Sequence, residues 1–182
     1  MNILESSKIL FVCFIWGDNE SYVKEAIKLF QTLKDLGGKL SNAKKIIYVT
    51  ELIDPNSSKI LSKLGVKTKL IKDFSNKTPY MNKPQNLKQV LDEDFDLLIM
   101  LDTDIVITGD FSSLIDITKI GVKQDEIDPV GLENWEKLFK YFKIQFPTKL
   151  YSCSYSDQHT VAFLNSGVLL IPKEYANKFY ES

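Results

Sequence analysis

The stretch Leu97–Asp110, LLIMLDTDIVITGD, indicates the fold of the whole chain. Its first residues form a continuous apolar run, which predicts a strand buried on both faces, as in a parallel sheet. Asp102 and Asp104 follow at once, and two carboxylates at this spacing lie on the same side of an extended chain. Because ligands bind at the carboxyl ends of strands in open α/β sheets, the pattern predicts a polar site there.

Two carboxylates beside a hydrophobic core cost free energy unless a cation or hydrogen bonds compensate them. Mn²⁺ or Mg²⁺, bridging Asp102 and Asp104 to a substrate phosphate, suits such hard oxygen ligands. The alternative is a solvated turn after a buried strand, because Asp is common in turns. The D-x-D pattern alone leaves both interpretations open.

Composition restricts the class of protein. With 182 residues, 44% of them apolar and 26% charged, the chain is expected to form a single domain over residues 1–182. The net charge is 23 − 24 = −1, which gives no indication of nucleic-acid binding. Every basic residue is Lys, so a phosphate would be held by Lys, backbone N–H groups or metal. No apolar run approaches the roughly 20 residues of a membrane span, and Cys13 and Cys153 are expected to be buried thiols. These features predict a soluble, cytoplasmic protein.

Apolar runs alternate with helical periodicity along the first two thirds of the chain. The predicted strands and helices are, in order, strand 8–16, helix 22–36, strand 45–50, a short helix after Asp54, strand 66–71, helix 85–91 and strand 97–101. This alternation predicts an α/β fold with a largely parallel sheet flanked by helices. Neither G-x-G-x-x-G nor a P-loop sequence occurs, so the dehydrogenase and P-loop classes lose their main support.

The remaining segments are less regular. We expect the acidic residues Asp92, Glu93, Asp94 and Asp96 to form a solvated turn. Residues 121–142 are expected to contain an amphipathic helix, with Trp135, Phe139 and Phe142 in a core. Residues 144–160 are expected to be irregular. A strand over 161–171 would be interrupted at Asn165-Ser166-Gly167, which a core strand would avoid.

Four stretches of this sequence resemble a known family in the family's own order. They are WGDNESYVKEAIKLFQTLK (16–34), MNKPQNLKQV (81–90), LIMLDTDIVITGDFSSL (98–114) and FLNSGVLLIPKE (163–174). The chain thereby resembles the GT-A glycosyltransferases, nearest to the glycogenin and lipopolysaccharide galactosyltransferase-like group, glycosyltransferase family 8. The resemblance implies a GT-A-like, Rossmann-like nucleotide-binding fold.

The resemblance also implies roles for particular residues. Asp102 and Asp104 would coordinate Mn²⁺ or Mg²⁺ at a nucleotide diphosphate. The residues implied to bind the donor are Tyr22 under the base, Thr103 against the ribose, Lys83 at the phosphates, and Asn165, Ser166 and Gly167 around the sugar.

The chain departs from the family pattern near its end. The family has an Asp-Gln pair and a late His-containing metal motif after the Asn-Ser-Gly strand, whereas this sequence ends about 15 residues after it. The C-terminal part of the family fold is therefore short or missing, and the third metal ligand has no match. We expect either one domain of a longer protein or a minimal relative. Asp157, close to the single histidine His159, is the nearest candidate for a general base or acceptor contact.

The predicted function is metal-dependent transfer of a sugar from a nucleotide-diphosphate donor, UDP-sugar by family habit, to a glycan, protein or lipid acceptor. One alternative is a domain that binds nucleotide sugars without catalysis. Another is a haloacid-dehalogenase-type phosphatase, in which Asp102 would be the nucleophile and Asp104 the general acid.

Overall fold

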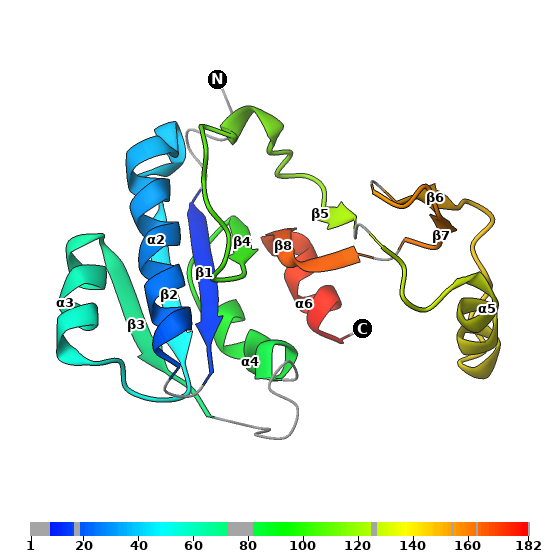
Figure 1. Ribbon diagram of the computed structural model, residues 1–182, viewed down its shortest axis with the longest axis horizontal. Helices are drawn as coiled ribbons and strands as arrows, with labels where there is room; N and C mark the ends of the chain where they lie inside the picture. The colour runs from blue at the N-terminus through cyan, green and yellow to red at the C-terminus, as the bar shows by residue number, and fades with distance from the viewer. Residues whose placement is uncertain are drawn as a thin grey trace. The chain divides into compact units, whose positions relative to one another are not determined.

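A computed structural model describes residues 8–16, 19–72, 82–124, 127–153, 155–162 and 164–181 (Figure 1). The chain forms two compact units. Unit 1 comprises Met1–Gly121 and Gly167–Ser182, and unit 2 comprises Val122–Ser166. No helix among the described residues is both long and apolar enough to cross a membrane.

Unit 1 is built on a mostly parallel sheet, as the alternating pattern predicts. The sheet has six strands in the order β3-β2-β1-β4-β8-β5, of which β5 belongs to unit 2 except for its first residue and β8 belongs to unit 1 from Gly167 on. Their bounds are β1 Ile9–Ile15, β2 Lys44–Val49, β3 Val66–Leu70, β4 Leu97–Leu101, β5 Gly121–Gln124 and β8 Leu164–Pro172. Strands β3, β2, β1 and β4 are mutually parallel, and β8 runs antiparallel to β4.

The first two predicted crossover helices are confirmed, although the first begins at Glu20, two residues before its predicted start. Asn19 caps α2 (Glu20–Leu36) by accepting the Ser21 N–H, and Gly37 ends that helix before the short 3₁₀ helix η1 (Gly38–Leu40). Asp54 caps α3 (Pro55–Lys63) in the same way. Proline at the first helical position costs nothing, because its missing N–H would have no partner inside the helix.

The two faces of the sheet are covered by different helices. Alternate residues of β1, namely Phe11, Cys13 and Ile15, belong to the core that α2 and α3 cover. The opposite face includes Tyr48 of β2, whose hydroxyl donates to the carbonyl of Gln89 in α4 (Asn82–Leu91). Helix α4 packs with α6 (Lys173–Glu181). Burial on both faces explains why these strands are continuous apolar runs.

The acidic segment before β4 differs from the expected solvated turn. Glu93 is largely buried, forms ion pairs with Lys44 and Lys69, and accepts a hydrogen bond from Tyr48. Burial alone would raise the pKa of Glu93, but the two ammonium groups outweigh it and hold this pKa below its usual range. Glu93 therefore ties the start of β4 to β2 and β3. Sequence alone does not show this, because the partners lie on other strands.

Unit 2 contains the helix α5 (Leu132–Tyr141) and the two-residue strands β6 (Tyr151–Ser152) and β7 (His159–Thr160), which pair antiparallel. The expected helix is confirmed but starts at Leu132, after Gly131 with φ 75°. Its aromatic residues do not form the expected core: Trp135 and Phe139 are half-buried, and Phe142 is exposed.

Strand β8 also differs from the prediction. It runs without interruption from Leu164 to Pro172, so Asn165, Ser166 and Gly167 lie within a strand and do not break one. The register with β4 is part of the reason: β4 pairs with Val168–Pro172, so Asn165 and Ser166 lie beyond the part of β8 that pairs with β4. Polar residues there do not interrupt the ladder that β8 forms with β4.

Candidate functional site

The D-T-D sequence follows β4 at its carboxyl end. The Asp102 N–H donates to the carbonyl of Gly167 at 2.9 Å, which continues the pairing of β4 with β8 for one more residue. The chain then turns, because the Ile105 N–H lies 3.4 Å from the carbonyl of Asp102. The extended backbone that would place Asp102 and Asp104 on one side is therefore not present. Asp102 is half-buried and Asp104 is exposed at this turn.

Thr103 anchors this turn to helix α2. Its buried side chain donates from Oγ1 to Oε2 of Glu25 at 2.8 Å. The other oxygen of Glu25, Oε1, accepts from the Ser21 hydroxyl at 3.2 Å. Glu25 thus links the D-T-D turn to the first turn of α2, which also carries the exposed Tyr22. Sequence reasoning missed Glu25, although its position three residues after Tyr22 places both near one face of the helix.

The segment after the D-T-D turn also lies along α2. The Ile107 N–H donates to Oγ1 of the buried Thr32 at 3.1 Å. Asp110 accepts hydrogen bonds from the backbone N–H groups of Ser112 and Lys39. The hydrogen bond from Ser112 is the main reason why the pKa of Asp110 lies below its usual range. Gly38 has φ 53°, and a Cβ there would overlap the Asp110 carboxylate. Asp110 therefore has a structural role, because it joins the segment after the D-T-D turn to the end of α2 and η1.

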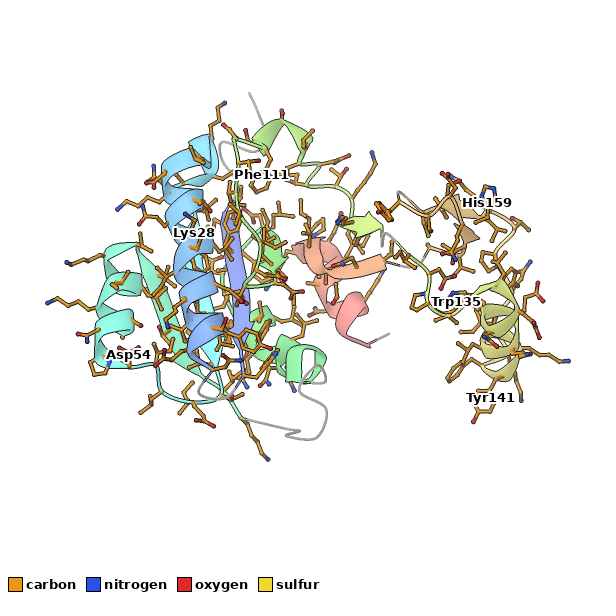
Figure 2. All side chains as sticks on the ribbon, in the orientation of Figure 1. Lys28, Asp54, Phe111, Trp135, Tyr141 and His159 are labelled. Atoms are coloured by element: carbon orange, nitrogen blue, oxygen red, sulfur yellow. The ribbon has the colours of Figure 1, made fainter. Side chains whose placement is uncertain are left out.

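A cavity of about 460 Å³ opens near the carboxyl ends of β1 and β2. Its walls come from the first turns of α2 and α3 and from the segment between β2 and α3, where Asp54 lies (Figure 2). The lining residues are Glu20, Val23, Lys24, Glu51, Leu52, Ile53, Asp54 and Ser57. Lys24 is paired with Glu20 at 2.8 Å, so the unpaired charge of the lining is acidic.

The carboxylates of Asp102 and Asp104 are suitable ligands for a hard divalent cation whose remaining ligands come from a substrate. Among the described residues, no three Asp, Glu, His or Cys side chains group closely enough to hold a metal by themselves. Mg²⁺ commonly binds through one or two carboxylates plus substrate phosphates and waters, without a complete protein cage. Asp102 and Asp104 supply ligands of that kind, at the point where a strand ends.

The other predicted site residues have different placements. Lys83 belongs to α4, but its side chain lies outside the described residues. Asn165 and Ser166 belong to unit 2, whereas Gly167 belongs to unit 1 and contacts Asp102 through its carbonyl. Asp157 is exposed in unit 2, with φ 53°.

Unit 2 has a buried polar centre that sequence reasoning did not identify. Asp128 accepts hydrogen bonds from the N–H groups of Val130 and Gly131, from Nε1 of Trp135 and from the Thr160 hydroxyl. Burial alone would raise the pKa of Asp128, but these donors outweigh it and lower the pKa. Its backbone N–H donates to Gln158 at 3.2 Å, so the centre also positions the segment that contains Asp157. His159 contacts the Ser152 hydroxyl across the β6–β7 pair, at 3.2 Å.

The fold is that of GT-A-like glycosyltransferases. Core-mannan synthase A from Aspergillus fumigatus, in its Mn/GDP form, superposes with TM-score 0.60 at 9% identity over 96% of this chain and 63% of that chain. Mouse xyloside xylosyltransferase 1 superposes with TM-score 0.56 at 13% identity, over 95% of this chain and 70% of that chain. The glycosyltransferase GlyE of Streptococcus pneumoniae gives 0.52 at 16% identity, over 96% of this chain and 36% of that chain. The chain thus spans little more than a third of GlyE.

The family follows from the sequence. The chain belongs to the family described as the Rhodobacterales glycosyltransferase domain, whose model matches residues 13–182. A comparison with curated proteins finds no match. Membership of a glycosyltransferase family sets aside the phosphatase alternative.

Proposed function

We propose that this domain catalyses metal-dependent transfer of a sugar from a nucleotide-diphosphate donor to a glycan, protein or lipid acceptor. The observation that carries the proposal is the D-T-D turn, which follows the central strand β4 and is joined to α2 by Glu25. We place the protein nearest to glycosyltransferase family 8, with residues 1–182 acting as one GT-A domain. Cys13 and Cys153 are buried and form no disulfide among the described residues, which supports a reducing, cytoplasmic location.

Charge at this edge of the sheet favours a metal-dependent mechanism. Glu20, Glu25, Glu51 and Asp54 come from segments near the carboxyl ends of β1 and β2, and Asp102 and Asp104 follow β4. A diphosphate brought among carboxylates is repelled unless positive charge is supplied. Mn²⁺ or Mg²⁺ held by Asp102 and Asp104 would stabilise the negative charge that develops on the leaving diphosphate.

The chain's own residues would bind and orient the donor. Thr103 and Glu25 hold the turn in place, so that the Asp102 and Asp104 carboxylates need little reorganisation. Lys83 would add positive charge at the phosphates, and Tyr22 would stack on the base. Asn165, Ser166 and Gly167 would contact the sugar, where a glycine allows close backbone approach. Asp157 is our candidate for the acceptor-side base.

The cavity beside α2 is the place that we assign to the nucleoside base. Ligands of open α/β sheets bind outside the carboxyl ends of the strands, where this cavity lies. Glu51 makes no hydrogen bond or ion pair with any other described residue, so its carboxylate is available to accept N–H groups of a base. A UDP-sugar is our first candidate donor, and a GDP-sugar is the second, since a structural neighbour is a Mn/GDP form.

The proposal is tested by calorimetry with UDP, GDP and their sugar conjugates, each with and without Mn²⁺. The double variant Asp102→Ala/Asp104→Ala should lose Mn²⁺-dependent nucleotide affinity by at least about 100-fold, because it removes both carboxylate ligands. The matched control is Asp92→Ala/Asp94→Ala, which has the same spacing before β4 and exposed side chains. Nucleotide binding that persists in the first variant, or is absent from the folded wild type, would contradict the proposal.

A further inference from the structure

The three carboxylates that line the cavity beside α2 differ in what they already bind. Glu20 is paired with Lys24 at 2.8 Å. Asp54 caps α3 by accepting two backbone N–H groups of its first turn, at 2.9 and 3.0 Å. Glu51 is exposed at the cavity and makes no hydrogen bond or ion pair with any other described residue. Glu51 is thus the lining carboxylate that a ligand can use.

The other walls of the cavity suit a planar ring. Val23 of α2 and Leu52 and Ile53 of the segment after β2 are apolar lining residues. Leu52 is 85% exposed, so the core does not use its side chain. The volume of about 460 Å³ lies within the range of pockets that hold small molecules. The cavity therefore combines apolar walls with a carboxylate that can accept hydrogen bonds from a ring held between them.

Hydrogen-bond donors are scarce in the same lining. Among its described residues Lys24 is the only cation, and its ammonium group is paired with Glu20. The backbone N–H of Ser57 already donates to Asp54. A base edge rich in carbonyl oxygens would find few donors here and would be repelled by Glu51. The lining therefore favours a base edge that donates hydrogen bonds.

The nucleobases differ in the number of adjacent donors on their pairing edge. Guanine presents two, N1–H and the N2 amino group, and two parallel N–H groups can form a bidentate pair with one carboxylate. Uracil has a single donor, N3–H, between two carbonyl oxygens. Adenine and cytosine have one amino donor beside a ring nitrogen that accepts. Of these four bases, guanine matches an unpartnered carboxylate best.

We infer that Glu51 gives this domain a preference for guanine nucleotides, by accepting the N1–H and N2–H groups of a base held in the cavity beside α2. The inference rests on the proposed function, which places the base of the donor in this cavity. It reverses the order of the two candidate donors, because the resemblance to family 8 favours a UDP-sugar whereas the charge of the cavity favours a GDP-sugar. Glu51 is a specificity-determining residue in this account.

The test is calorimetric titration of the full chain with GDP, inosine diphosphate and UDP, each in the presence of Mn²⁺. Inosine diphosphate differs from GDP only by lacking the N2 amino group. GDP should bind at least about 10-fold more tightly than inosine diphosphate, because the latter loses one of two hydrogen bonds to a charged group. GDP should exceed UDP by the same factor or more.

The variant Glu51→Gln makes the test specific to this residue. Its amide offers one acceptor and an NH₂ group, so the affinity for GDP should fall at least about 10-fold. The affinity for UDP should stay the same or rise, because the repulsion between the carboxylate and the uracil carbonyls is removed. The matched control is Glu174→Gln on α6, which makes the same change in charge at an exposed position and should leave both affinities at the wild-type values.

Several results would overturn the inference while leaving metal-dependent nucleotide binding intact. They are equal affinities for GDP and inosine diphosphate, tighter binding of UDP, and unchanged affinity for GDP in Glu51→Gln. Equal loss of GDP and UDP affinity in that variant would also overturn it, because it would show a structural role for Glu51. Absence of binding of every nucleotide to the folded wild type would overturn the proposed function as well, so the two failures are distinguishable.

Discussion

In unit 1 the buried side chains are mostly apolar residues of β1, β2, β4 and α2, whereas the buried residues among those described in unit 2 are Asp128, Cys153, Thr160 and Val161. Unit 1 is therefore stabilised chiefly by burial of apolar area, which has no preferred direction. Unit 2 depends more on hydrogen bonds that converge on one carboxylate, and these need a particular geometry.

The difference suggests a division of roles. A core of packed strands and helices can hold the D-T-D turn rigidly, because packed interiors resist deformation. A unit with few buried apolar residues leaves its aromatic side chains available for external partners. The predictions below test how far the two kinds of stabilisation differ.

The largest effect is expected from Leu33→Ala in α2, where the side chain is fully buried. Deleting a buried leucine loses transfer free energy and leaves a cavity, so the free energy of unfolding should fall by about 2–5 kcal/mol. The matched variant in α5 is Leu138→Ala, whose side chain is 40% exposed and should cost less than about 1 kcal/mol. Urea denaturation of both variants measures the contrast, and equal losses would contradict it.

The next effect is expected from Asp128→Asn in unit 2. The amide keeps one acceptor for the Val130 and Gly131 N–H groups but faces the Thr160 hydroxyl and the Trp135 indole with an NH₂ group. Loss of charge-assisted hydrogen bonds in a buried place should cost about 1.5–3 kcal/mol. The measurement is the emission of Trp135 during denaturation, in a Trp16→Phe background that leaves Trp135 as the single tryptophan. An unchanged Trp135 transition would show that Asp128 does not organise unit 2.

The smallest effect is expected from Glu93→Gln in unit 1, which removes the charge partner of Lys44 and Lys69. Both lysines are more than a third exposed, so we expect a loss of only about 1–2 kcal/mol at neutral pH. The lowered pKa of Glu93 means that the unfolded state binds its proton more readily than the folded state. Its stabilisation is therefore complete above the unfolded pKa of about 4.3, and it is lost as pH falls through the folded value.

Denaturation of the wild type and of Glu93→Gln between neutral and acidic pH measures this linkage. The stability difference between the two proteins should shrink on acidification, because the wild-type carboxylate then becomes protonated. A difference that stays constant down to pH values below the folded pKa would show that Glu93 acts through its shape and not through its charge.

The sequence alone predicted the strands and helices of unit 1, because the features that indicate each of them lie within one short segment. The apolar run of β4, the caps Asn19 and Asp54 and the period of α2 are each visible within one segment. The predictions failed where the determining partner lies elsewhere in the chain. Glu93 was expected in a solvated turn, yet its lysines come from β2 and β3.

The candidate site divides in the same way. The D-T-D residues and the resemblance to GT-A glycosyltransferases were visible in sequence, and the GT-A-like fold is confirmed. The predicted roles of all site residues stay predictions, namely those of Asp102 and Asp104 at the metal, of Tyr22, Lys83, Thr103, Asn165, Ser166 and Gly167 at the donor, and of Asp157. Sequence alone determined the fold class and predicted a site at the end of β4, because strand patterns and turn residues are local. Only the tertiary structure decided that Thr103 is held by Glu25, that the chain turns at Asp102, and that Asp128 organises unit 2. The first and third of these features depend on hydrogen bonds between residues far apart in sequence, whose pairing has no local periodicity. The turn at Asp102 is local, but the D-x-D pattern alone does not distinguish it from an extended chain.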